Sequence, residues 1–158
     1  MAQYGIGQPV RRDEDPRHLK GGGRFIDDTN LPGQLHAYLL RSTRAHAAIG
    51  GMDLRNAEAA PGIAAVLTGK DVIADGIGTP KMQAPHKRPG GAPLFHRAHR
   101  GLSTDFVKYV GDPIAMVVAE SLDAAKDAAE LIRIDYHPLP SVNATAAALA
   151  PGAPAVWP

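Results

Sequence analysis

The chain has 158 residues, of which 44% are hydrophobic and 21% are charged, and these values predict one folded domain with a real core. A net charge of +1 and 5% aromatic residues argue against a nucleic-acid partner. The absence of cysteine excludes disulfides and thiolate-held zinc or iron–sulfur clusters within this chain. No apolar run approaches the roughly 20 residues that span a bilayer. We therefore expect a cytoplasmic protein without a membrane partner.

The first part of the chain is interrupted by glycine, proline and mixed charge. Residues 1–33 therefore predict an extended arm with turns rather than a helix. The pattern changes in "QLHAYLLRS" at 34–42, where Leu35, Ala37 and Leu39 alternate with other residues. This period of two predicts a half-buried strand.

Three further elements and a long loop follow. The segment "AHAAIGGMDL" at 45–54 is predicted to pair back onto the first strand. A short helical turn in "LRNAEAAPG" at 54–62 leads to an apolar strand at 63–69. Residues 74–101 contain four prolines and much positive charge, and so predict an irregular functional or partner-facing loop.

A strand, a helix and another strand are predicted beyond this loop. Gly111 begins a turn, and "IAMVVAE" at 114–120 has the unbroken apolar character of a strand covered on both faces. Ser121 stands where a helix N-cap belongs, ahead of a segment with high helix propensity. The small apolar residues of this helix form a thin face that can approach a sheet closely: Ala124, Ala125, Ala128, Ala129 and Leu131.

The last strand, "LIRIDY" at 131–136, should complete a right-handed crossover before "HPLP" stops it. The alanine- and proline-rich end then has the composition of a linker. The prediction is an α+β fold with a mixed sheet, divided into an extended arm at 1–33, a domain at 34–145 and a linker at 146–158 that leads to absent domains.

Several motifs that suggest chemistry have simpler interpretations. "LKGGGR" and "LTGKD" lack the spacing of a phosphate-binding loop, and the first is read as a structural turn, with an anion or partner contact as the alternative. Asp27 and Asp28 could act as an acid–base pair, although adjacent acidic residues on a turn usually accept from their own backbone amides. His86, His96 and His99 could hold a metal, but four Lys or Arg neighbours favour a basic, partner-facing loop.

Three collinear blocks carry a family resemblance. They are "IGQPVRRDEDPRHLKGGGRFIDDTNLPGQLHAYLLRSTRAHAAI", "APGIAAVLTGKDV" and "KYVGDPIAMVVAESLDAAKDAAELIRIDYHPLPSV". Together they resemble the N-terminal α/β hammerhead domain of molybdenum hydroxylase large subunits, the group of xanthine oxidase, aldehyde oxidase and carbon monoxide dehydrogenase. Residues 74–101 follow no pattern of that family.

The resemblance implies a non-catalytic scaffold. In that family the molybdopterin-binding loops and the catalytic glutamate lie in later domains, so we expect no catalytic, cofactor or metal residue here. The assembled enzyme would contain molybdopterin, 2Fe-2S clusters and FAD. The implied partners are molybdopterin-binding domains or subunit, an iron–sulfur subunit and an FAD subunit. The candidate partner interface consists of arm cations: Arg11, Arg12, Arg17, Lys20 and Arg24.

Two other hypotheses stay open from the residues alone. The chain could be a free-standing module whose basic loop from Lys81 to Arg100 captures an anionic ligand or protein. It could also be a small hydrolase that uses Asp27, Asp28 or a loop histidine. Association with redox partners would favour the scaffold over both.

Overall fold

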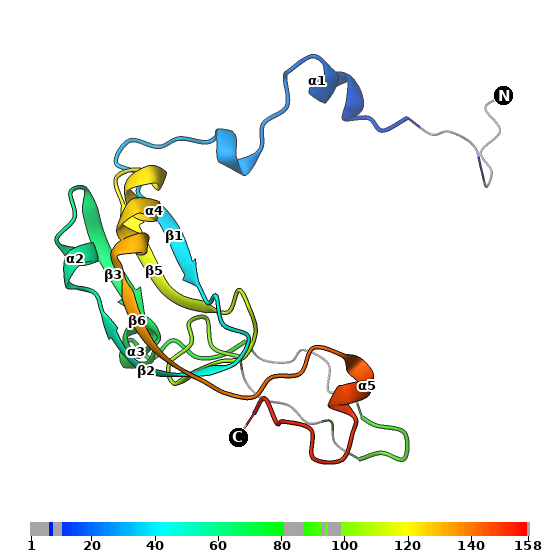
Figure 1. Ribbon diagram of the computed structural model, residues 1–158. Coiled ribbons are helices and arrows are strands. Elements are labelled where there is room, and N and C mark those ends of the chain that lie inside the picture. Colours follow the sequence, from blue (N-terminus) through cyan, green and yellow to red (C-terminus); the bar gives the residue numbers. More distant parts are fainter. Residues whose placement is uncertain (1–6, 8–10, 81–86, 93, 95–98, 158) are drawn as a thin grey trace. The chain divides into compact units, whose positions relative to one another are not determined.

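The computed structural model describes residues 7, 11–80, 87–92, 94 and 99–157. The chain divides into two compact units, Met1–Gln34 and Leu35–Pro158, which we call the arm and the body (Figure 1). The expectation of one folded domain is thus refined to a body with its own core and a separate arm.

The arm contains a short helix that the sequence analysis did not predict. Helix α1 spans Asp15–Leu19 and a 3-10 turn, η1, spans Ile26–Asp28. At the end of α1 the Gly22 N–H donates to the Arg17 carbonyl (2.9 Å) and the Gly21 N–H to the His18 carbonyl (3.0 Å). Gly21 has a φ of 73°, so this is a Schellman end that glycine adopts without strain. The same glycines that suggested an extended segment thus terminate a helix.

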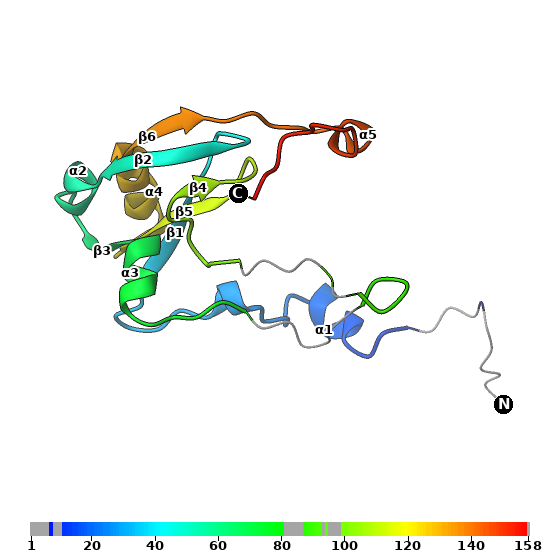
Figure 2. The ribbon, with the colours of Figure 1, turned by 90° about the horizontal axis from the view of Figure 1, so that it is seen from below.

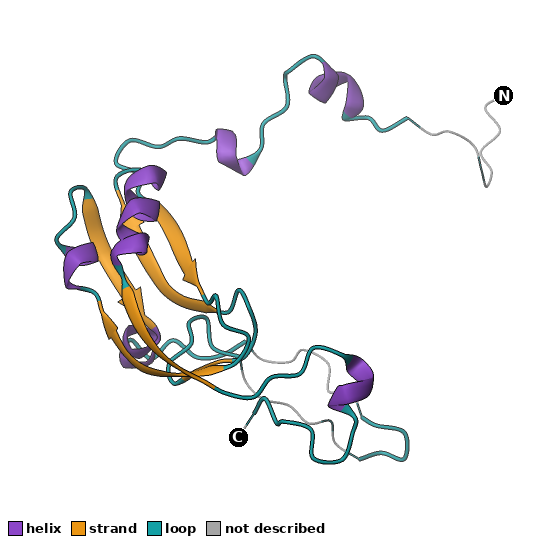
Figure 3. Ribbon diagram, viewed as in Figure 1, coloured by secondary structure: helices purple, strands orange, loops and turns teal. Residues whose placement is uncertain are grey.

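The body is built from six strands and four helices in the part of the chain that the structure describes (Figure 3). The strands form two three-stranded sheets, with orders β1-β5-β3 and β4-β2-β6, and every pairing in them is antiparallel. This confirms the α+β class. The elements are β1 (His36–Arg41), β2 (Ala47–Asp53), α2 (Arg55–Glu58), β3 (Ile63–Thr68), α3 (Gly69–Ala74), β4 (Phe106–Val107), β5 (Pro113–Ala119), α4 (Leu122–Leu131), β6 (Arg133–Pro138) and α5 (Thr145–Ala148).

Two predicted pairings are wrong. Strand β2 does not fold back onto β1; it pairs with β4 and β6, whereas β1 pairs with β5, so that Leu39 lies opposite Met116. Strands β5 and β6 flank α4 but belong to different sheets, so the right-handed crossover of parallel strands does not occur. Two antiparallel sheets therefore stand where one mixed sheet was predicted, because β5 pairs with β1 and β3 and β6 pairs with β2, instead of β5 and β6 pairing with each other.

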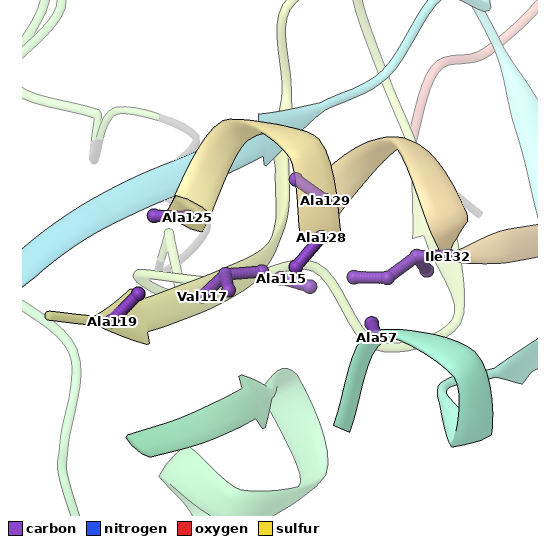
Figure 4. Packing of buried hydrophobic residues seen from close by; sticks show 8 residues of the cluster. All are labelled: Ala57, Ala115, Val117, Ala119, Ala125, Ala128, Ala129 and Ile132. Carbon is purple, nitrogen blue, oxygen red and sulfur yellow. The ribbon is translucent and has the colours of Figure 1, made fainter. Parts of the chain in front are cut away.

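Helix α4 covers one face of the sheet β1-β5-β3. The Ser121 hydroxyl accepts from the Ala124 N–H (3.1 Å), which confirms the predicted N-cap. Alanines 125, 128 and 129 of α4 are buried against Ala115, Val117 and Ala119 of β5 (Figure 4). Leu131 is instead exposed, and Ile132 takes the buried position at the helix end. The predicted thin helix face is confirmed for its alanines.

The opposite face of β5 is covered less completely than predicted. Met116 and Val118 on that face are half-buried, whereas the residues facing α4 are fully buried. Helix α3 lies beside β3, at the edge of this sheet, when the body is seen from below (Figure 2). The sheet thus keeps an incompletely covered apolar side.

Helix α3 begins at a capping box that the sequence contains as T-x-x-D. The Asp71 carboxylate accepts from both the hydroxyl and the N–H of Thr68, each at 2.7 Å, and the Lys70 N–H donates to the Thr68 hydroxyl (3.3 Å). The Thr68 hydroxyl, followed by its backbone N–H, lowers the pKa of Asp71. "LTGKD" is therefore a helix start rather than a phosphate loop.

We expect the substitution Thr68→Val to raise the pKa of Asp71, because it removes the hydroxyl that stabilises the carboxylate. Since the folded pKa lies below the unfolded one, this cap stabilises the fold above the unfolded pKa and is lost as pH falls through the folded pKa. An NMR titration of the Asp71 carboxyl carbon measures the shift. Thr68→Ser keeps the hydroxyl and is the matched control, and equal pKa values in all three proteins would contradict the assignment.

Candidate functional site

The five cations of the predicted interface all lie on the arm. Arg11, Arg12, Arg17, Lys20 and Arg24 are exposed. None of them forms an ion pair with another described residue. Their charges are therefore not neutralised by local pairing, which suits residues that contact a separate surface.

The arm also exposes large apolar side chains. Leu19 is 86% exposed and Ile26 90%, and Phe25 and Leu31 are each 67% exposed. Neither α1 nor η1 contains a buried residue. We call these four side chains with the five cations the arm surface. Four large apolar side chains exposed to this degree on one short segment make it a candidate for contact with another surface.

The glycine run and Asp28 of the arm have structural roles. A Cβ on Gly23 would collide with the His18 ring, which stacks on Phe25 with centroids 5.3 Å apart. The Asp28 carboxylate accepts from the Phe25 N–H (2.9 Å). The turn interpretation of "LKGGGR" is confirmed, and Asp28 binds its own backbone as the simpler interpretation predicted.

Of the three loop histidines, only His99 lies among the described residues. His86 and His96 lie outside the described residues, while His99 packs edge-on against Trp157 (centroids 5.3 Å apart). The Lys108 ammonium lies 4.4 Å from the centre of the same ring. Within the described ranges, no group of three possible ligands is close enough to hold a metal. Trp157, at the end of the predicted linker, packs on the body.

Sequence reasoning missed a buried histidine. His46 is 8% exposed, and its Nδ1 donates to the Pro140 carbonyl (2.8 Å), while the His46 carbonyl accepts from the Leu139 N–H (3.0 Å). These bonds tie the segment after β6 to the start of β2. The isolated histidine gave no local signal, because its partner lies 94 positions away.

A second candidate surface lies on the incompletely covered side of the sheet β1-β5-β3. It is a cavity of about 430 Å³ that we call the hollow. Its walls come from the sheet, from α3 and its C-terminal turn, and from the segment before β4. They are predominantly apolar, with Arg100 and His99 as the charged and titratable members. The lining residues are Leu39, Val72, Ile77, Gly78, Pro80, His99, Arg100, Gly101, Leu102 and Met116.

The chain matches the family model described as "Aldehyde oxidase and xanthine dehydrogenase, a/b hammerhead domain" over residues 20–140. The chain belongs to this family. It is 41% identical over 138 residues to the 6-hydroxypseudooxynicotine dehydrogenase complex subunit gamma of Paenarthrobacter nicotinovorans, covering 87% of this chain and 17% of that subunit. The family model begins just after α1 and includes all six strands of the body.

Solved structures show the same hammerhead fold. The reconstituted CO dehydrogenase from Oligotropha carboxidovorans matches with a TM-score of 0.78 and 34% identity, covering 95% of this chain and 17% of that one. Quinoline 2-oxidoreductase from Pseudomonas putida 86 matches with a TM-score of 0.72 and 39% identity, covering 91% and 18%. This chain thus spans less than a fifth of the length of these hammerhead-containing proteins.

Cofactor binding can be tested against the residues of this chain. With no cysteine, it cannot supply the thiolates that hold a 2Fe-2S cluster. The hollow does not fit a molybdenum group either, because its wall is largely apolar.

No helix among the described residues is both long and apolar enough to span a membrane.

Proposed function

We propose that this chain is a non-catalytic scaffold and interface domain, or subunit, of a molybdopterin-dependent oxidoreductase. The assembled enzyme would hydroxylate an aldehyde or N-heteroaromatic compound, or oxidise carbon monoxide. Family membership supports the enzyme class, and the 17% coverage of a dehydrogenase subunit supports a role as one part of a larger assembly.

The arm surface is the observation that carries this proposal. A segment that exposes Leu19 and Ile26 almost completely gains little from its own fold. Burial of these side chains by a partner would remove apolar area from water, and the five arm cations would orient the contact. The arm is therefore an element that assembly completes.

The partners follow from what this chain does not supply. Molybdopterin-binding domains or a subunit would hold molybdenum, an iron–sulfur subunit would hold the 2Fe-2S clusters, and a further subunit would hold FAD. A chain without cysteine is compatible with the reducing cytoplasm, where we place the enzyme.

Co-purification tests this function. We would express the chain with the polypeptides encoded beside it, purify through a tag on this chain, and measure molybdenum and iron by mass spectrometry together with the visible spectrum. We expect both metals near stoichiometric amounts. A folded chain that purifies alone, without either metal, would contradict the scaffold and favour the binding-module hypothesis.

The same preparation tests the arm surface. We expect the double substitution Arg11→Ala and Arg12→Ala to weaken assembly about tenfold and to leave the melting temperature unchanged, because exposed charges mainly tune association. Arg44→Ala with Arg133→Ala removes two exposed cations from the body, neither of which forms an ion pair with a described residue, and is the matched control. A drop in melting temperature for the arm variant would show that these arginines stabilise the fold instead.

A further inference from the structure

The hollow combines an apolar floor with a wall on a different element. Leu39 of β1 and Met116 of β5 form paired positions in the sheet, on neighbouring strands. Val72 of α3 and Ile77, which follows that helix, also line the hollow. Ile77 is 58% exposed, so its side chain is in contact with solvent. A volume of about 430 Å³ is sufficient for large apolar side chains of another polypeptide.

The segment that contributes Arg100 to the wall of the hollow is rich in positive charge. Residues 74–101 hold five of the chain's 17 Lys and Arg but only one of its 16 Asp and Glu. Arg100 brings this positive charge into the wall itself and is exposed. In a chain whose net charge is only +1, this segment is a local concentration of positive charge. Its complement is a surface with carboxylates.

We propose that the hollow is a docking site for an acidic, apolar segment of the polypeptide that carries the molybdopterin-binding domains. This inference rests on the proposed function, since it names the partner surface that the scaffold binds. Apolar side chains of the segment enter between Met116 and Ile77, and a flanking carboxylate pairs with Arg100. A nucleic acid would pair with the cations but would leave the aliphatic walls without a partner.

The apolar part of the contact is tested with Ile77→Glu in the co-expressed complex. Because Ile77 is 58% exposed, the substitution leaves the fold intact, but it places a carboxylate in an apolar hollow opposite an acidic segment. We expect affinity for the partner polypeptide to fall at least tenfold. Leu122→Glu makes the same change at a side chain that is 42% exposed on α4, which covers the other face of the sheet, and should leave affinity within twofold.

The charged part is tested with Arg100→Glu against Arg133→Glu, an equal change at an exposed position of β6. We expect Arg100→Glu to weaken binding about tenfold at low ionic strength, and less as added salt screens the charges. The Arg133 variant should bind like the unsubstituted chain. Thermal denaturation of all four variants shows that each is folded.

The outcomes separate this inference from the proposed function. If the unsubstituted chain does not assemble with the partner, the proposed function is overturned, and the docking site with it. If it assembles and Ile77→Glu binds as well as Leu122→Glu, the docking site alone is overturned. Competition for the hollow by a single-stranded oligonucleotide, added as a probe, would assign Arg100 to nucleic-acid binding and would also overturn the docking site.

Discussion

The substitution Gly69→Ala should lower the free energy of unfolding by about 3 kcal/mol. A Cβ at this position would lie 2.7 Å from the Thr104 methyl carbon, 2.8 Å from the Ser103 carbonyl oxygen and 2.9 Å from the Leu102 carbonyl oxygen. Two of these three atoms belong to the backbone, so rotation of a side chain cannot relieve the contact. The start of α3 or the segment before β4 must move.

The same substitution at two other glycines of the body is the control for Gly69→Ala. A Cβ at Gly50 would meet only the ends of the His137 and Asp135 side chains, which are exposed and can rotate away. A Cβ at Gly51 would have no neighbour within 4 Å. We expect Gly51→Ala to change stability by less than about 1 kcal/mol, with Gly50→Ala intermediate. Urea denaturation followed by circular dichroism measures all three.

The close packing at Gly69 should also affect partner binding at the hollow. It holds α3 against Leu102, and Val72, Ile77 and Leu102 all line the hollow. A displacement of α3 would therefore change the shape of the hollow, so Gly69→Ala should weaken partner binding as well as stability. Stability equal to that of Gly51→Ala would show that the backbone around Leu102 yields easily, and would contradict this close approach.

Elements that depend on neighbouring residues could be predicted from the sequence. The Ser121 cap and the buried alanines of α4 follow from local hydrogen bonding and helical spacing. The capping box at Thr68 and Asp71 is also a local sequence signal. Helix α3 was nevertheless missed, because this motif was tested only as a phosphate loop. Helix α1 was missed for a similar reason, since Gly21 was read as an interruption rather than as a helix terminator.

Strand partners could not be predicted because they are set over long distances in sequence. An apolar alternation predicts that β1 is a strand, but it does not state that Leu39 pairs with Met116 rather than with a residue of β2. Strand β4 has two residues and exists through its pairing with β2, so no periodicity could reveal it. Family resemblance supplied the fold without supplying these pairings.

Of the two candidate surfaces, one could be predicted from the sequence and the other could not. Arm cations could be named from the sequence because exposure of Lys and Arg is the rule. The hollow could not, since its walls come from β1, α3, β5 and the segment before β4, which meet only in the folded body. The positive charge of the segment that contains Arg100 was visible in the sequence, but the apolar residues that line the hollow with Arg100 could not be assembled from it.

The tight packing of α4 on β5 leads to the second large effect. We expect Ala128→Leu to lower the free energy of unfolding by about 3 kcal/mol, because added methylene and methyl groups must displace the helix from the sheet. Ala128 is 1% exposed and belongs to the same buried cluster as Val117 (Figure 4). Asp127→Leu adds an apolar side chain on the exposed side of the same helix and should change stability by less than about 0.5 kcal/mol.

A compensating substitution shows whether volume is the cause. Val117→Ala alone creates a cavity and should cost about 2 kcal/mol. Combined with Ala128→Leu, it provides space for the added side chain, so the double variant should lose less stability than the sum of the two single losses. Strictly additive losses, measured by denaturant unfolding, would show that the two residues do not share one packed space. In that case helix propensity or a shift of α4 as a whole would have to explain the loss caused by leucine.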